Sequence, residues 1–297
     1  MTKKDIYQAV TDRILEALDR GVVPWRKPWT SRNSMPVSLS TGKAYRGVNM
    51  ILLAMAGYSD PRWGTYKAIK AAGGQIRKGE KGTKIILWKP VRKTFENAET
   101  GEEETGAYLL LREYTVFNAE QADGLPEFDR EERPEHEQNE RAEAVWAGYK
   151  SRPALLHGRT GAYYSPAKDM VGMPDPEDFI GPAEYYQTLF HELIHSTGHE
   201  SRLDRIEPAI FGSDPYAKEE LVAEIGASML AGLAGLETAG DEQSAAYVAS
   251  WAKRFREDPK LIVNAAAQAQ KAADLILGET FEGETFAPIA ETAAVAA

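Results

Sequence analysis

The sequence predicts a two-domain α+β protein, in which a small mixed α/β domain is followed by a mainly helical domain with a short sheet. Three observations lead to this prediction. Helix-like and strand-like hydrophobic patterns alternate over residues 1–125, a polar and charged stretch covers residues 126–140, and Ala-rich helical patterns dominate residues 141–278. We expect the final segment, residues 279–297, to be frayed or disordered.

The first domain should contain three helices and a hairpin. Apolar residues at helical spacing indicate an opening helix that stops at Gly21, namely Ile6, Ala9, Val10, Ile14, Leu15 and Leu18. Two further helices are expected near residues 48–56 and 65–72. Residues 84–91 (KIILWKPV) and 107–117 (AYLLLREYTVF) are apolar, aromatic and β-branched, which is typical of strands. The acidic segment between them predicts a solvated hairpin loop.

The second domain should be mainly helical. A helix begins near Arg141, and the sequence AYYSPAKDMVGMP at residues 162–174 is typical of an edge strand that ends at prolines. A helix containing HELIH follows, and the dipeptide Asp214-Pro215 is expected to open a long helix. Ala-rich helix continues to Leu277. Because the linker is long, polar and charged, we expect each domain to fold and to bind its own ligand independently.

Composition narrows the class of protein. The chain has no Cys, which excludes disulfides and thiolate metal sites and fits a reducing compartment. Its start lacks the apolar core of a signal peptide, and no stretch approaches the roughly 18 consecutive apolar residues that a membrane helix needs. We therefore expect a cytoplasmic protein that makes no membrane contact.

Charge is divided unevenly along the chain. Residues 1–95 carry 19 Lys and Arg against 6 Asp and Glu, a net charge of +13, whereas the remainder carries 16 against 39, a net charge of −23. Such asymmetry predicts a first half that binds a polyanion and an acidic second half. An acidic half that mimics DNA in the site of a nuclease is a weaker explanation, because the first half is strongly basic.

The motif HELIHSTGH predicts a metal-binding helix. His191 and His195 are four residues apart, so both imidazoles project from one face of a helix and can bind one cation. Glu192 follows the first histidine, where its carboxylate can act as general base on a metal-bound water. An extended motif with a third histidine is excluded, because Ser201 occupies that position. His199 is therefore expected to cap the turn or to line the site.

A glutamate on the following helix is the remaining source of a third ligand. The segment YAKEELVAEIGASML offers Glu219, Glu220 and Glu224, of which the last two share a helical face. One of that pair can bind the metal while the other accepts an N–H from a histidine ligand, although spacing alone does not assign the two roles. Glu219 is expected to face solvent. One divalent ion fits this donor set, and we expect Zn²⁺. An oxyanion donor is also needed, and six residues are candidates: Tyr163, Tyr164, Tyr185, Tyr186, Tyr216 and His199.

The basic first half is also rich in aromatic residues. The segment PWRKPW sets two indoles around an Arg-Lys pair, and two further basic segments, TGKAYRGVNM and GGQIRKGEKGTK, follow. Aromatic faces that stack on bases and cations that follow phosphates are typical of single-stranded DNA binding. The candidate DNA contacts are Trp25, Arg26, Lys27, Trp29, Lys43, Tyr45, Arg46, Asn49, Arg77, Lys78, Lys81 and Lys84. Trp88 lies inside a predicted strand and is expected in the core. A phosphate-binding P-loop is excluded, because Glu80 stands where its lysine would be.

Two resemblances extend this interpretation. The motif HExxH followed by E-x-x-A-E resembles the glutamate-type zincin peptidases, which implies that Glu220 is the ligand and Glu224 its outer partner. Both halves resemble the ArdC antirestriction family of conjugative plasmids, in VTDRILEALDRGVVPWRKPW, TGKAYRGVNM, GGQIRKGEKG, EYTVFNAEQADGLP, HELIHSTGHESRLDR and YAKEELVAEIGA. The resemblance implies a single-stranded-DNA-binding domain, a zincin-like metallopeptidase domain, and protection of incoming plasmid DNA against restriction endonucleases.

Two other functions remain open. A DNA-tethered zinc metalloprotease would cleave a DNA-bound protein, so its partner would be a protein substrate or a restriction enzyme. A purely structural metal would make the chain a binding module, but such a site has no use for the base that Glu192 provides.

Overall fold

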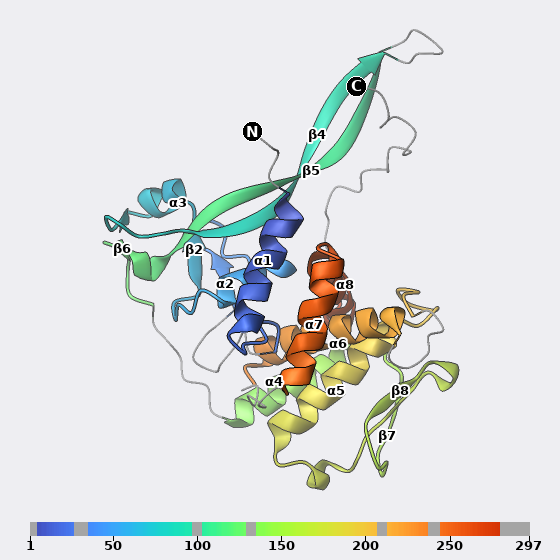
Figure 1. Cartoon of the computed structure of the whole chain (residues 1–297). Helices are drawn as coiled ribbons and strands as arrows, with labels where there is room; N and C mark the ends of the chain where they lie inside the picture. The colour runs from blue at the N-terminus through green and yellow to red at the C-terminus, as the bar shows by residue number, and fades with distance from the viewer. Residues whose placement is uncertain are drawn as a thin grey trace.

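The computed structural model describes residues 5–26, 35–96, 103–128, 135–206, 213–236 and 244–279 (Figure 1). Its helices are α1 (Ile6–Asp19), α2 (Val48–Ala54), α3 (Tyr66–Ala71), α4 (Glu135–Gly148), α5 (Pro182–Thr197), α6 (Asp214–Ala234), α7 (Ala245–Glu257) and α8 (Leu261–Leu277). Its strands are β1 (Val37–Ser38), β2 (Arg62–Gly64), β3 (Gln75–Ile76), β4 (Thr83–Glu96), β5 (Glu103–Asn118), β6 (Ala122–Asp123), β7 (Ala154–Leu156), β8 (Tyr163–Ser165) and β9 (Met170–Gly172). This mixture of helices and small sheets confirms the predicted α+β class.

Predicted and observed boundaries differ in the middle of the chain. Helix α4 begins at Glu135, so the second part of the expected linker, residues 126–140, is helical. The expected tail falls almost wholly outside the described residues, which end at Glu279. None of the described helices has the length and apolar character that a membrane crossing requires.

Strands β4 and β5 form a long antiparallel ribbon that extends away from the helices (Figure 1). Their pairing runs from Thr83 opposite Val116 to Glu96 opposite Glu103. The predicted strands are therefore present, but the ladder continues into the acidic segment that was expected to be a loop. Backbone hydrogen bonds support pairing there whatever the side chains are. The ribbon belongs to a four-stranded sheet with the order β1-β2-β5-β4.

The second sheet lies beside α5 and has the order β7-β9-β8 (Figure 1). Residues 162–174, expected to form one edge strand, form two strands: β8 lies at the edge, whereas β9 is central and pairs with both β7 and β8. The Tyr163 ring of β8 rests on Gly172, where an added Cβ would lie 2.6 Å from the tyrosine Cζ. A side chain at position 172 would therefore displace β8 from the helix that carries the HELIH motif.

The two halves share one hydrophobic core. Helix α1 packs against α7 and α8 and lies between them and the ribbon (Figure 1). Its buried residues Val10, Ile14 and Leu18 join a single cluster with apolar residues of α5, α6, α7 and α8. A polar contact adds to this packing, because Thr11 Oγ1 donates to the carbonyl of Pro259 at 2.7 Å. This packing contradicts the expectation of two independently folded domains.

The loop after α1 links the two halves through both packing and hydrogen bonds. The Trp25 side chain is fully buried and makes edge-to-face contacts with Trp251 and Phe255, at centroid distances of 5.9 and 5.5 Å. Its indole Nε1 donates to Glu224 Oε2 at 2.8 Å, and Arg26 Nη2 donates to Glu224 Oε1 at 2.7 Å. Trp25 is therefore a core residue, and its expected role as a base-stacking surface is wrong.

Replacing Trp25 should unfold both halves together. Trp25→Ala removes a buried indole from the shared core and should cost about 3–5 kcal/mol of unfolding free energy. Trp25→Phe keeps an aromatic ring but removes the donor to Glu224, and should cost about 1–3 kcal/mol. Urea unfolding followed by circular dichroism and by tryptophan fluorescence would measure both losses.

The matched control is Trp88→Ala, since this indole is half-exposed on the ribbon. It should lower the unfolding free energy much less than Trp25→Ala does, because about half of this side chain is already in contact with water. Two separate unfolding transitions in Trp25→Ala, with the second at the parent's midpoint, would contradict the shared core.

Candidate functional site

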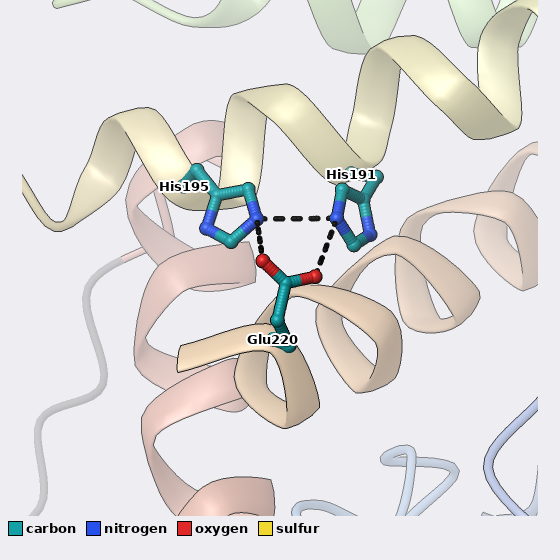
Figure 2. Close-up of side chains that lie close together, drawn as sticks. All are labelled: His191, His195 and Glu220. Atoms are coloured by element: carbon teal, nitrogen blue, oxygen red, sulfur yellow. Dashed lines mark hydrogen bonds and ion pairs between the residues drawn. The ribbon is translucent and has the colours of Figure 1, made fainter. Parts of the chain in front are cut away.

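Helices α5 and α6 bring three metal-ligand types together (Figure 2). His191 and His195 lie one turn apart on α5, with their Nε2 atoms 3.1 Å from each other. Glu220 of α6 faces both rings, with its carboxylate oxygens 3.5 Å from His191 Nε2 and 3.5 Å from His195 Nε2. Two imidazoles and one carboxylate that converge in this way suit Zn²⁺ or a similar divalent ion, with a further position left for water.

Close helix packing makes this convergence possible. A Cβ on Gly226 of α6 would lie 2.6 Å from Ile194 Cδ1 of α5. Only a residue without a side chain allows the helices to approach so closely, and Ile194 is itself the neighbour of His195. The small residue therefore sets the separation at which Glu220 reaches the histidines.

Glu219, and not Glu224, is the outer partner of a histidine. Glu219 Oε1 lies 3.1 Å from His195 Nδ1, and the same carboxylate receives hydrogen bonds from Arg205 Nε at 2.7 Å and Arg205 Nη2 at 2.8 Å. The expectation that Glu219 faces solvent is therefore wrong. So is the expected role of Glu224, which lies one turn further along α6 and is held by Trp25, Arg26 and Tyr247.

Charge coupling shifts the protonation of the metal-ligand residues. Burial disfavours the charged form of His195, but hydrogen bonds to Glu219 and Glu220 outweigh it and raise its pKa to about 9. Burial also opposes ionisation of Glu220, yet its hydrogen bonds to both histidines hold the pKa of this carboxyl well below its usual range. In the metal-free chain, the protonated His195 ring is therefore held as an ion pair with the carboxylates of Glu219 and Glu220.

Glu192, the predicted general base, lies beside these residues. Its side chain faces the same cavity but is nearly buried, and burial raises the pKa of the carboxyl while His191 and His195 oppose the shift. A backbone hydrogen bond from Tyr164 on β8 holds the carboxylate in position. A carboxylate with a raised pKa beside an open coordination position suits proton transfer at neutral pH.

Two arginines after α5 were missed by the sequence analysis. Arg202 makes two bonds to Asp169, at 2.8 and 2.7 Å, and also donates to the carbonyl of Ser196. Arg205 donates to the carbonyl of Ile194 at 2.9 Å as well as to Glu219. The signal was present, because cations that follow a helix commonly satisfy its last carbonyls.

The site opens into a cavity of about 860 Å³ between α5, β8, α6 and α8. Asn264 and Gln268 of α8 also line it. Tyr216 also lines it, four residues before Glu220 on α6. Burial raises the pKa of Tyr216 to about 12, and a hydrogen bond to Glu220 adds to the shift.

Of the other oxyanion candidates, Tyr163 and Tyr164 also line this cavity. The Tyr164 hydroxyl donates to Asp169, and the Tyr163 ring is packed on Gly172. His157 contacts the Tyr185 hydroxyl, and Tyr186 donates to Glu143. His199 Nδ1 lies 2.8 Å from Ser201 Oγ in the turn after α5, in agreement with its expected role in the turn. Tyr216 is the candidate whose hydroxyl hydrogen-bonds to the predicted ligand Glu220.

Several predicted DNA contacts have structural partners instead. Asn49 is buried, and its amide exchanges two hydrogen bonds with the backbone of Ile86, at 2.7 and 2.9 Å, so its expected DNA contact is wrong. Arg46 forms an ion pair with Asp274, and Arg77 forms pairs with Glu80 and Asp123. Tyr45 is half-buried against the core, where burial raises the pKa of its hydroxyl.

The other predicted contacts are exposed or undescribed. Four lysines are exposed on the first half, namely Lys43, Lys78, Lys81 and Lys84. Arg26 is 37% exposed but is bound to Glu224. Lys27 and Trp29 lie outside the described residues. Trp88 was expected in the core, and this is wrong, because its side chain is 49% exposed on β4.

Two models of known protein families match the two halves of the chain. Residues 4–117 match the N-terminal domain of anti-restriction factor ArdC, and residues 140–268 match a zincin-like metallopeptidase domain. Along its length, the chain is 43% identical to the metal-free crystal structure of the antirestriction protein ArdC from plasmid R388, covering 92% of this chain and 97% of that one with a TM-score of 0.73. The chain belongs to the ArdC antirestriction family. A Mn(II)-bound structure of the R388 protein is 41% identical, covers 93% and 98% of the two chains, and gives a TM-score of 0.74.

Longer relatives contain the same unit. The chain is 42% and 40% identical to two proteins named DNA primase TraC from Escherichia coli, over 93% of its own length but only 27% and 20% of theirs. It is also 38% identical to the uncharacterized protein y4eC of Sinorhizobium fredii, over 92% of both chains. The chain thus spans about a quarter or less of the TraC relatives and nearly all of y4eC.

Matched substitutions on α6 should distinguish the roles of its three glutamates in metal binding. Glu220→Gln should abolish stoichiometric metal binding, and Glu219→Gln should weaken it about 10- to 100-fold because His195 loses the negative charge of its acceptor. Glu224→Gln should leave metal affinity unchanged and lower stability, because its partners lie in the shared core. Calorimetric titration with Zn²⁺ would measure all three. Normal affinity in Glu219→Gln together with loss in Glu224→Gln would restore the role first expected of Glu224.

Metal stabilisation should grow as the pH rises. The pKa of His195 in the folded, metal-free chain, about 9, lies above the unfolded value of about 6.5. Stability from the protonated ring is therefore complete below about pH 6.5 and is lost as the pH rises through about 9. A bound metal requires the neutral ring and does not suffer this loss. The gain in Tm on adding Zn²⁺ to EDTA-treated protein should therefore increase from pH 6.5 to 9, and a gain that stays constant would refute the coupling.

Proposed function

We propose that this protein binds single-stranded DNA and protects incoming plasmid DNA from restriction endonucleases in the cytoplasm of the recipient cell. One observation carries the proposal, namely the similarity to an antirestriction protein along 97% of that protein's chain. The excess of basic residues in the first half supports it, since cations are what a DNA backbone attracts.

We propose further that His191, His195 and Glu220 bind one divalent ion, and that this ion is Zn²⁺. The donor set supports zinc, since two imidazoles and a carboxylate are its usual ligands where a position stays open. A related structure is described as Mn(II)-bound, which supports a divalent site of this kind. When bound, the ion would lower the pKa of a water and polarise a carbonyl. Glu219 and Arg205 would then fix the orientation of His195.

A second function, a DNA-tethered metallopeptidase, is favoured by the cavity. Glu192 faces this cavity with a raised pKa and could take a proton from an attacking water. Tyr216 lines the same cavity and would donate its hydroxyl to a developing oxyanion. The substrate would be a protein on the same DNA, either a restriction enzyme or another bound protein. Tyr216→Phe with undiminished cleavage would exclude that role for the tyrosine.

The substitution Glu192→Gln distinguishes protection by coating of the DNA from protection by cleavage of a protein. This change removes a base and keeps the size of the side chain, so metal content and DNA affinity should stay close to those of the parent. We expect protection against restriction to survive, because coating the strand needs no protein substrate. Transfer of unmodified plasmid into a restricting recipient would measure it. Lost protection with normal metal and DNA binding would favour the peptidase.

The control for DNA binding must avoid the core. Replacing Trp25 and its neighbours would unfold the chain, so the paired exposed lysines Lys78 and Lys81 are better targets. Charge reversal, Lys78→Glu with Lys81→Glu, should weaken DNA binding and reduce protection while metal content is kept. Full protection by a variant that no longer binds DNA would contradict the coating function.

A further inference from the structure

Trp88 on β4 is a tryptophan that the fold leaves open to solvent. Its side chain is 49% exposed, whereas Trp25, Trp63 and Trp251 are at most 6% exposed. Leu87, the residue before it, is exposed to a similar degree, 43%, but strand alternation places it on the opposite face of the ribbon. A single exposed apolar residue is ordinary. The surroundings of the indole therefore decide what it does.

The Trp88 indole of β4 contacts Tyr7 of α1, and Tyr7 in turn contacts the residue directly before α8. The ring centroids of Trp88 and Tyr7 of α1 are 6.4 Å apart, with their planes at 57°. Lys260, directly before α8, places its Nζ 5.6 Å from the centre of the Tyr7 ring. An aromatic pair with a cation beside it is thus assembled from three elements that are far apart in the sequence.

Hydrogen bonds hold this junction in one geometry. Arg13 Nη1 of α1 donates to the carbonyl of Lys84 on β4 at 2.7 Å. On the other side of the helix, Thr11 Oγ1 donates to the carbonyl of Pro259, the neighbour of Lys260. A surface fixed before binding loses little entropy when a ligand arrives. The exposed face of Trp88 is therefore a preorganised surface.

Two lysines lie near this aromatic pair. Lys84 is on the same face of β4 as Trp88, four residues away, or about 13 Å at ~3.3 Å per residue. Its side chain is 48% exposed, and its Nζ is 3.6 Å from Glu113 Oε2. Such an exposed ion pair contributes little, so a phosphate can compete for the ammonium. Lys260 is exposed and lies beside Tyr7, the ring that contacts Trp88.

We propose that the exposed face of Trp88 stacks on a base of single-stranded DNA, while Lys84 and Lys260 contact phosphates of the same strand. This inference rests on the proposed function and names a surface for it. Unpaired bases offer the free faces that stacking needs, whereas the bases of a duplex are already stacked on each other. The occupant that fits one exposed aromatic face with two cations near it is therefore a single strand.

The surface also belongs to both halves of the chain. Trp88 and Lys84 lie in the part that matches the ArdC N-terminal domain, and Lys260 lies in the part that matches the metallopeptidase domain. Helix α1, which supports the indole, packs on α7 and α8. Full affinity for a single strand therefore requires the full chain.

The test uses the full-length protein and a labelled oligothymidylate, with binding measured by fluorescence anisotropy. Trp88→Ala should weaken binding about ten-fold, within the range expected for loss of one stacked base. Leu87→Ala is the matched control, since it removes a similarly exposed residue from the same strand on the other face, and it should change affinity less than two-fold. Lys84→Ala and Lys260→Ala should each lower the salt slope of binding by about one.

A second measurement guards against loss of fold. Trp88→Phe keeps an aromatic ring, so it should bind better than Trp88→Ala but should lose the quenching of tryptophan fluorescence that the oligonucleotide causes in the parent. Equal affinities for Trp88→Ala and Leu87→Ala, or full quenching in Trp88→Phe, would overturn the assignment while leaving DNA binding intact. A parent chain that binds no single strand would instead overturn the proposed function itself.

Discussion

Three carboxylates on α6 lie largely away from bulk water, and the partners that each one requires organise the structure. A buried carboxylate without donors is strongly unfavourable. Glu219 is satisfied by Arg205 and His195, Glu220 faces the two histidines, and Glu224 is held by Trp25 and Arg26. One helix therefore fixes the metal site through its first two glutamates and the first half of the chain through its third.

This arrangement explains why the chain is a single structural unit although it matches two family models. The polar stretch after residue 125 connects the two halves in the sequence. Contacts between residues of the two halves nevertheless stabilise both of them. The matches to the longer TraC proteins likewise run across both halves of the chain. The basic first half and the acidic second half, which have opposite net charges, are therefore parts of one folded unit.

Sequence patterns predicted the HELIH helix and its histidines, because a four-residue spacing fixes their relative geometry whatever surrounds the helix. Spacing left Glu220 and Glu224 open as the third ligand, and the resemblance to the glutamate-type zincins pointed to Glu220. Both failed for the surroundings of Glu219 and Glu224, since helical spacing does not reveal which neighbouring element a side chain meets. For the same reason, the predicted burial of Trp25 and Trp88 was wrong, because Trp25 is buried and Trp88 is exposed. A Pro-flanked loop looked exposed but is covered by α7, and a strand that looked buried has one face covered only in part by α1.

The contact between Trp25 and Glu224 joins residues 199 positions apart, and this distance has a consequence for synthesis. At roughly 5–20 residues per second, the ribosome needs about 10–40 s to produce the second partner after the first. During that interval the amphipathic face of α1 has no helix to cover it. Nascent chains must therefore carry an exposed apolar stripe near their start, which is the kind of surface that chaperones recognise, until α6, α7 and α8 leave the ribosome tunnel.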